Sequence, residues 1–305
     1  MRSWLMALLL VGGAAQAGDG REALRKAERG NNWEAALEAA DALATGAPRA
    51  SADAAHAAWR RAEALGYVGR QEEAEAGFAA FAKAFGAAAD PPRETELAWG
   101  LTARGEWLGN RNRFPEAISQ FDEVIARFGN RADPRFDPPL SKAAGMRAAA
   151  LGRTGSTAEA MRGIDAVEAR YGASSDPQVQ AHVAMSMMVR GMMQADAKDE
   201  EAAIASFDRV IARYGTSEAV EPLQVAMIAT MAKMSSLMSL KRLDEAKAVG
   251  RAVIDSIDED MPQELKEAAA PVAFMMIALE MGEKMEAAAK DEMEGEPITI
   301  PAPQD

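Results

Sequence analysis

Residues 114–129 read FPEAISQFDEVIARFG, and this stretch decides the fold. Its apolar residues recur at spacings of four, three and four, which is the spacing of one face of an α-helix: Ala117, Phe121, Val124 and Phe128. The stretch ends in an aromatic residue followed by glycine, and a glycine in the left-handed conformation is a common helix stop. We therefore expect a helix with one buried face that ends in a left-handed residue at Gly129.

The same pattern returns every 43 residues along the chain. Its first alanine recurs in five copies: Ala74, Ala117, Ala160, Ala203 and Ala246. Its terminal aromatic–glycine pair recurs in four: Phe85-Gly86, Phe128-Gly129, Tyr171-Gly172 and Tyr214-Gly215. A shorter-spaced partial copy over residues 31–37 begins the series. A regular period of this length is typical of a stacked array of helical hairpins.

The residues between the copies predict the first helix of each hairpin. An Asp-Pro pair recurs in the same register: Asp90-Pro91, Asp133-Pro134 and Asp176-Pro177. Aspartate suits the N-cap of a helix, and proline suits its first position. We expect this helix to end near Gly66, Gly109 and Gly152. A column of small residues along it lets the two helices of a hairpin approach closely: Ala62, Gly105, Ala148 and Gly191.

These features resemble the tetratricopeptide repeat (TPR) family. The resemblance rests on the small residue before the hairpin turn, on the run GRQEEA at residues 69–74, and on the aromatic residue four positions after Ala74. It covers roughly residues 22–258, and the units are longer than the usual length of about 34 residues. The resemblance implies an all-α superhelical solenoid of TPR-like hairpins, which we assign to residues 18–258.

A helical C-terminal cap is expected over residues 259–290, followed by a disordered acidic and proline-rich tail at residues 291–305. Pro271 is expected to kink the capping helix or to split it in two. The end of a repeat array needs a polar outer face. Charged residues are available for that face: Glu264, Lys266, Glu267, Glu280, Glu283, Lys284 and Glu286.

The N-terminus has the pattern of a cleavable export signal. Met1-Arg2 supplies a positive charge, residues 4–11 are apolar, and Ala15-Gln16-Ala17 has the A-x-A form of a cleavage site. The alternative is a membrane anchor, but the apolar run is shorter than the roughly 20 residues that span a bilayer. We predict a signal peptide over residues 1–17, a periplasmic or secreted protein, and no stable membrane insertion after cleavage. No cysteine is present for lipid attachment.

Charge and composition exclude several classes of function. The formal net charge of −13 disfavours binding to nucleic acid and favours neutral or basic partners. The absence of cysteine excludes disulfides and thiolate metal sites. His56 and His182 have no ligand-spaced neighbours, and the chain has no phosphate-binding loop, nucleophile elbow or zinc motif. We predict that the protein is not an enzyme and that it uses no cofactor.

In the TPR family the first helix of each hairpin lines a concave groove, so the resemblance implies a binding surface along these helices. On the 43-residue register the groove residues are Trp59, Glu63, Trp99, Glu106, Met185, Met188, Met192 and Met231. The N-terminal part of this surface is aromatic and acidic. The C-terminal part is rich in methionine, which adapts to varied apolar ligands. The alternative is that some of these residues pack between neighbouring hairpins.

A column of basic residues has the same period: Arg61, Arg104, Arg147, Arg190 and Lys233. One interpretation is a track for carboxylate or phosphate groups. A second column consists of Asp122, Asp165 and Asp208, each 18 residues after an arginine of the first column. Facing helices would pair the two columns into a charged ladder that fixes the stacking register, and we favour this structural interpretation.

The sequence thus predicts a non-enzymatic scaffold or adaptor of the cell envelope, which binds a protein or peptide segment in the groove of the array. An alternative is a periplasmic carrier of copper or of a small molecule, because thioethers bind Cu(I) and methionines crowd the C-terminal half near His182. Methionine is also a common filler of irregular cores, so these residues have a purely structural interpretation as well.

Overall fold

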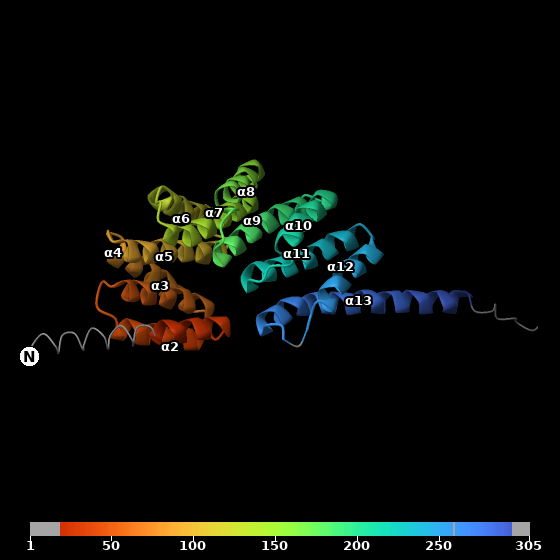
Figure 1. The fold of residues 1–305 in the computed structure, drawn as a ribbon, viewed down its shortest axis with the longest axis horizontal. Helices are drawn as coiled ribbons and strands as arrows, with labels where there is room; N and C mark the ends of the chain where they lie inside the picture. The colour runs from red at the N-terminus through yellow and green to blue at the C-terminus, as the bar shows by residue number, and fades with distance from the viewer. Residues whose placement is uncertain (1–18, 259, 295–305) are drawn as a thin grey trace, which may run out of the picture. The chain divides into compact units, whose positions relative to one another are not determined.

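The computed structural model describes residues 19–258 and 260–294, and the regular structure within them is entirely helical (Figure 1). This confirms the all-α prediction. The predicted signal segment, residues 1–17, and the part of the predicted tail from residue 295 onward lie outside the described residues. The chain forms two compact units that divide between Ser186 and Met187.

Residues 19–29 form the first described helical segment. The elements that follow are α2 (Trp33–Gly46), α3 (Ala52–Tyr67), α4 (Gln71–Phe85), α5 (Pro91–Gly109), α6 (Phe114–Phe128), the short 3₁₀ helix η1 (Pro134–Phe136), α7 (Asp137–Arg153), α8 (Thr157–Tyr171), α9 (Pro177–Asp196), α10 (Glu200–Tyr214), α11 (Val220–Ser239), α12 (Leu243–Asp255) and α13 (Gln263–Glu294). The division between the two units falls within α9.

Helices pack in the order in which they follow one another along the chain. In the first unit each helix from α2 to α8 contacts the next one, and α5 also contacts α3 and α7. In the second unit α10, α11 and α12 pack in the same consecutive manner, and α13 contacts both α11 and α12. This succession of neighbours is the arrangement expected of a helical solenoid.

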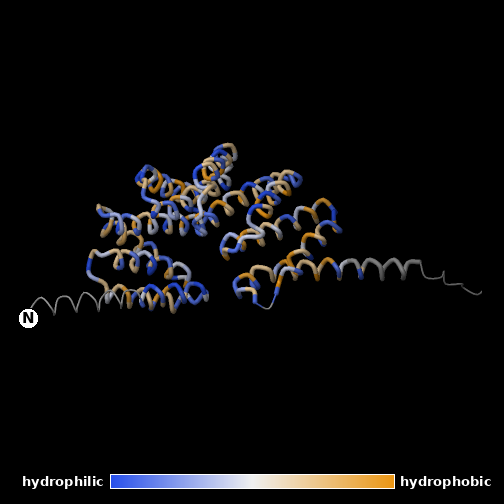
Figure 2. The backbone as a smooth tube through the Cα atoms, viewed as in Figure 1, coloured by the Kyte–Doolittle hydropathy of each residue, from blue (hydrophilic) through white to orange (hydrophobic). Residues whose placement is uncertain are grey.

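The predicted apolar faces of the second helices are buried. Ala117, Phe121, Val124 and Phe128 of α6 are each at most 1% exposed. Hydrophobic and hydrophilic residues alternate along the helices, as the periodicity requires (Figure 2). The apolar faces from which the hairpins were predicted are therefore the faces that are buried in them.

The left-handed residues lie in the turn inside each hairpin. The register-equivalent residues after the first helix have positive φ: Gly69, Asn112, Gly155, Lys198 and Lys241. The next backbone N–H bonds back to the end of the helix, as Arg70 N does to Leu65 O at 2.9 Å. This bond closes the C-terminus of a helix whose following residue is left-handed.

The prediction of a left-handed stop at Gly129 is wrong. Gly86, Gly129 and Gly215 have right-handed φ values of −57°, −60° and −68°. Glycine is needed here because a larger side chain would clash, and no left-handed φ is involved. A Cβ on Gly129 would lie only 2.4 Å from the carbonyl oxygen of Ile125, to which the Gly129 N–H bonds.

The carbonyl group of the same glycine is bonded by the following hairpin. Arg170 Nη2 donates to Gly129 O at 2.7 Å, and Arg127 Nη2 donates to Gly86 O. Each arginine also lies over the ring of the aromatic residue that follows it. The end of one second helix is therefore capped by the second helix of the next hairpin.

The predicted Asp caps are present. Asp90 Oδ1 accepts from Arg93 N at 3.2 Å at the start of α5, and Asp176 Oδ1 accepts from Val179 N at 3.0 Å at the start of α9. Asp133 Oδ1 caps η1 by accepting from Arg135 N, so α7 itself begins only at Asp137. The Asp-Pro register marks the start of helical structure in each case.

One glycine lies where the two helices of a hairpin cross. In α3/α4 it is on the second helix, where a Cβ on Gly77 would lie 3.0 Å from Ala62 Cβ. In α5/α6 it is on the first helix, where a Cβ on Gly105 would lie 2.5 Å from Phe121 Cε1. The close approach that the small column predicted is thereby confirmed. The next two crossings repeat this alternation at Gly163 and Gly191.

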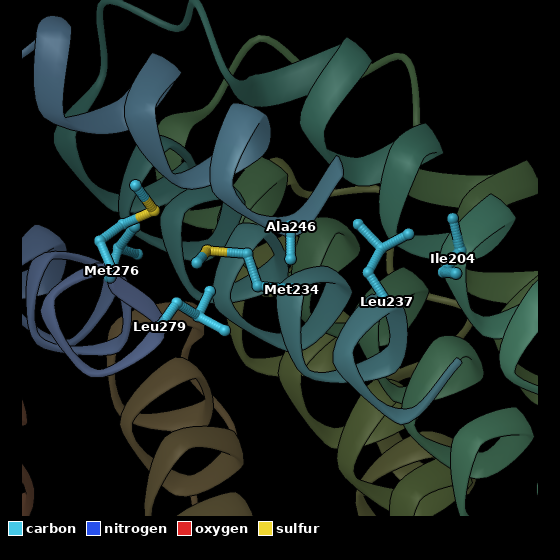
Figure 3. Packing of buried hydrophobic residues seen from close by; sticks show 7 residues of the cluster. Ile204, Met234, Leu237, Ala246, Met276 and Leu279 are labelled. Atoms are coloured by element: carbon cyan, nitrogen blue, oxygen red, sulfur yellow. The ribbon is translucent and has the colours of Figure 1, made fainter. Parts of the chain in front are cut away.

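The hairpin α11/α12 reverses the sizes at its crossing. Gly250 stands where other second helices have a bulky residue, and Met234 stands where other first helices have Ala or Gly. A Cβ on Gly250 would lie 2.6 Å from Met276 Sδ and 2.8 Å from Met234 Cε. The methionines fill this crossing as part of one core cluster in the second unit (Figure 3). In this hairpin the large side chain is on the first helix and the glycine is on the second, and the crossing is still filled.

The basic and acidic columns pair between consecutive hairpins. Arg147 Nε lies 2.5 Å from Asp122 Oδ1, and Lys233 Nζ lies 2.6 Å from Asp208 Oδ1. In both pairs the base is on the first helix of one hairpin and the acid is on the second helix of the preceding hairpin. Pairs this exposed contribute about 0–1 kcal/mol each, so they select the stacking register more than they stabilise it.

The C-terminal helix differs from the prediction on its outer face. α13 runs as one helix through Pro271, so the helix is not split. Its outer face is not wholly polar, because large apolar residues are exposed on it: Phe274 (75%), Ile277 (56%), Met281 (58%) and Met285 (71%). The expectation of a polar end-cap was wrong for this stripe.

Replacing Gly105 by alanine is expected to lower the free energy of unfolding by about 1–3 kcal/mol, the usual cost of overpacking a core. The added Cβ would lie 2.5 Å from the ring of Phe121. Urea denaturation followed by far-ultraviolet circular dichroism measures the change.

Gly109→Ala on the same helix is the matched control, because its added Cβ would have no neighbour closer than 4.0 Å. Adding Phe121→Ile to Gly105→Ala should recover part of the loss, since the following hairpin combines Ala148 with Ile164. Equal stability of Gly105→Ala and Gly109→Ala would contradict the role of the crossing glycine.

Candidate functional site

The predicted groove residues are distributed over both units. In the first unit they are Trp59 and Glu63 on α3, Trp99 and Glu106 on α5, and Met185 on α9; in the second they are Met188, Met192 and Met231. Trp59 is 2% exposed and Met188 is 6% exposed, whereas Met192 is 48% exposed. Trp59 and Met188 therefore pack internally, as the alternative interpretation of the predicted groove residues expected.

Glu96 of α5 joins three helices in the first unit. Its Oε1 accepts from Arg21 Nη1 at 3.0 Å, and its Oε2 accepts from Trp59 Nε1 at 3.0 Å. The same Oε2 lies 2.9 Å from His56 Nδ1. Burial by itself would raise the pKa of Glu96, but the hydrogen bonds from His56 and Trp59 and the charge of Arg21 outweigh it, so its pKa lies below the ordinary value. Glu96 is thus a buried, ionised anchor for the N-terminal helices.

The two histidines terminate one row of aromatic rings. The rings of Trp59 and Trp99 stack with centroids 6.5 Å apart and planes 12° apart. His56 meets the edge of Trp59 at 5.3 Å, and His182 meets Trp99 at 6.2 Å. Sequence separation hid this arrangement, because the residues come from three different helices. Within the first unit, Trp59 of this row is buried, whereas His56, Trp99 and His182 are partly buried.

His182 is held in its neutral form. Its Nδ1 lies 2.9 Å from Ser141 Oγ. Burial, together with the nearby charge of Lys142, lowers the pKa of His182 to about 3. At neutral pH this imidazole is therefore an uncharged packing residue of the aromatic row.

A cleft of about 220 Å³ lies between α3 and α5. It brings together Glu63 and Glu106, which occupy the same register position on neighbouring first helices. Tyr67, half exposed, lines it and stacks on Trp33 with ring centroids 3.8 Å apart. The remaining lining residues are Gly66, Ala103, Trp107, Asn110 and Arg111. This is the part of the predicted groove where surface charge and aromatic rings coincide.

The walls of this cleft carry the carboxylates of Glu63 and Glu106 and the guanidinium of Arg111. Burial and the carboxylates of Glu106 and Glu63 raise the pKa of Tyr67 to about 12. Glu106 Oε2 pairs with Lys142 Nζ at 2.6 Å, and Glu63 Oε2 pairs with Arg60 Nη1 at 2.9 Å. Each carboxylate is therefore balanced on one side by a base of the protein itself.

Trp107 forms the floor of the cleft and is 7% exposed. Arg111 lies over its ring at 4.3 Å from the centroid. Its Nε1 packs on Gly66, where a Cβ would lie 2.9 Å away, and makes no hydrogen bond to other residues that the structure describes. Gly66 is thus the residue that admits the indole between the two helices.

Three residues of this region, Glu96, Tyr67 and Trp107, were not predicted from the sequence. A signal for Glu96 was present, because Asp53, Glu96 and His182 fall in one column of the 43-residue register that otherwise holds Pro139 and Val225. Polar residues in a column with apolar ones indicate a buried polar network. Tyr67 and Trp107 lie beside the predicted column and carried no comparable signal.

Larger clefts elsewhere arise from the repeat geometry. One of about 360 Å³ lies among α6, α7 and α8, and one of about 420 Å³ lies among α10, α11 and α12. Their linings match at positions two repeats apart, for example Arg147 with Lys233 and Val167 with Val253. A cavity that recurs with the repeat is a product of how hairpins stack, so we do not assign it a special role.

Several methionines of the second unit are internal. Met227, Met234 and Met276 are at most 5% exposed and belong to its core clusters. Met231 packs against one of these clusters from its edge. These side chains fill irregular space between helices, as the structural interpretation expected.

Comparison with models of known protein families yields no match, and no curated protein sequence matches the chain. In residues 19–258 and 260–294, no three His, Cys, Asp or Glu side chains gather in an arrangement that could hold a metal ion. None of the described helices is both long and apolar enough to cross a membrane.

His182→Gln is expected to reduce the loss of stability on acidification. Below its ordinary pKa of about 6.5 an unfolded histidine takes up a proton, whereas the folded His182, with a pKa of about 3, does not. The folded state therefore loses up to about 1.4 kcal/mol per pH unit between roughly pH 6 and pH 4 through this residue.

Urea denaturation at several pH values measures this dependence. The carboxylates are common to wild type and variant, so their contribution cancels in the difference between the two curves. Parallel curves for the two proteins would contradict the burial of a neutral His182.

Proposed function

We propose that this protein is an exported, TPR-like adaptor that binds a basic segment of a partner protein on the first helices of its N-terminal hairpins. The cleft between α3 and α5 takes a cationic side chain of that segment. Export rests on the signal pattern of residues 1–17, and the adaptor role rests on the repeat architecture together with this cleft.

The observation that carries the proposal is the pair of carboxylates on the two walls. Glu63 and Glu106 line one partly open cleft from neighbouring helices, so a guanidinium or ammonium group placed there meets negative charge from both sides. The chain as a whole carries −13, which steers basic partners toward it.

Aromatic rings support the same ligand chemistry. Tyr67 exposes half of its surface at the cleft and is backed by the ring of Trp33. A cation above an aromatic ring gains about 0.5–1 kcal/mol at an exposed site. The long aliphatic stem of lysine or arginine also packs well on such a surface.

The existing ion pairs leave room for a ligand. Lys142 contacts Glu106 through Oε2, and Arg60 contacts Glu63 through Oε2. A carboxylate has two oxygens and about four acceptor positions, so each can receive a second donor. The protein's own bases then act as competitors that set the affinity.

Glu63→Gln combined with Glu106→Gln is expected to weaken binding of a basic peptide by about tenfold or more, because charge-assisted hydrogen bonds contribute about 1.5–3 kcal/mol. A fluorescein-labelled peptide of alternating alanine and arginine is the probe, and fluorescence anisotropy is the measurement. Matched peptides with glutamine or glutamate in place of arginine should bind weakly or not at all.

The control is Glu38→Gln combined with Glu72→Gln, which removes the same charge from exposed positions on α2 and α4. This control should keep nearly all of the affinity. Equal losses in the two double variants would show general charge attraction and would contradict binding in the cleft.

Lys142→Met should change the affinity in the opposite direction. It removes the base that now pairs with Glu106, so the arginine peptide meets less competition and should bind about threefold more tightly, the size of an exposed ion-pair effect. Weaker binding by this variant, measured in the same anisotropy assay, would contradict the role given to Glu106.

A further inference from the structure

A second surface lies on α13, independent of the cleft in the first unit. The inner face of this helix packs into the core, where Val272 and Met276 are at most 3% exposed. The opposite face carries the exposed residues Phe274, Ile277 and Met281. A helix that is apolar on two opposite faces has a second partner to cover the outer one. α13 also extends past α12 (Figure 1).

The outer face has the spacing of a short coiled coil. Residues at alternating intervals of three and four are all exposed along it: Glu267, Ala270, Phe274, Ile277, Met281 and Lys284. This is the a/d spacing of a heptad repeat. The four middle positions are apolar, and the two ends carry opposite charges. The stripe is about 26 Å long at 1.5 Å per residue.

The charges at the two ends make the stripe complementary to itself in one orientation. When two copies pair antiparallel, an a position of one helix faces a d position of the other. Phe274 then meets Ile277 of the second copy, Ala270 meets Met281, and Glu267 meets Lys284. A large residue faces a small one in the second pair, and opposite charges meet in the third. In a parallel pair Glu267 would face Glu267, and Lys284 would face Lys284.

We propose that α13 pairs antiparallel with α13 of a second copy, so that the protein is a homodimer joined at its C-terminal helices. The chain as a whole carries −13, so two copies repel each other at long range. The paired ends of α13 are the place where two copies attract. An interface made of one helix face is at the small end of stable interfaces, so we expect a dissociation constant in about the micromolar range.

Sedimentation equilibrium of the full chain tests the proposal. Wild type should show a monomer–dimer equilibrium, and Phe274→Ser combined with Ile277→Ser should be monomeric with an unchanged circular dichroism spectrum. Both residues are exposed, so the fold does not depend on them. A monomeric wild type at high micromolar concentration, or a dimer unaffected by the double variant, would overturn the proposal.

Charge exchange tests the orientation. Glu267→Lys alone and Lys284→Glu alone should each weaken the dimer at least tenfold, because like charges then meet at both ends. The variant that carries both changes should recover wild-type affinity. A mixture of the two single variants should form a heterodimer tighter than either homodimer. Unchanged affinity in the single variants would overturn the antiparallel register.

Crosslinking gives an independent readout, since the chain contains no cysteine of its own. A mixture of Ala270→Cys and Met281→Cys copies should form a disulfide on mild oxidation. Ala270→Cys alone should not, because in the antiparallel pair the two copies of residue 270 lie about 16 Å apart along the helix axis. Crosslinking of Ala270→Cys with itself would indicate parallel pairing and would overturn the proposed arrangement.

Discussion

The close crossing of the two helices in each hairpin is the constraint on which the rest of the structure depends. At each crossing one side chain is reduced to hydrogen, as at Gly77, Gly105 or Gly250, and a bulky residue or a second backbone takes the space. The glycine alternates between the second and the first helix along the array, and its neighbour is Ala62 at Gly77, Phe121 at Gly105 and Met276 at Gly250. In each case the space beside the glycine is filled, which agrees with the close packing of protein interiors. The buried faces and the interhairpin ion pairs recur on the same 43-residue register as these crossings.

The repeated elements of the fold could be predicted from the sequence, because each copy confirms the others. The buried face of α6 and the Asp caps follow from columns that recur every 43 residues. The basic and acidic columns recur as well, but Arg147 pairs with Asp122 of the preceding hairpin and not with the aspartate 18 residues after it, the offset that the sequence suggested. The conformation of Gly129 could not be read in the same way. A glycine that avoids a clash and a glycine that turns left-handed look alike in a sequence. Only the local path of the backbone distinguishes them.

The candidate site was predicted in part, and the residues that were missed are those that occur in a single copy of the repeat. Glu63 and Glu106, which share a register position, line the same cleft, whereas Trp59 of the predicted surface is buried and donates its indole N–H to Glu96. Glu96 itself depends on Arg21, which comes from a helix outside the regular spacing. The repeated columns predict the scaffold, whereas features that occur in only one copy of the repeat are not predicted by them. The outer face of α13 is another such departure, because it exposes large apolar residues where a polar face was expected.

The arginine that caps a preceding helix has a consequence for how the chain is made. Gly86 O accepts a hydrogen bond from Arg127, and Gly129 O accepts one from Arg170, each from the hairpin that is synthesised next. During synthesis the residue that caps each of these helix ends is therefore translated one repeat after the end itself. In the finished array the same contacts couple neighbouring hairpins, so that the end of one second helix is closed by the repeat that follows it.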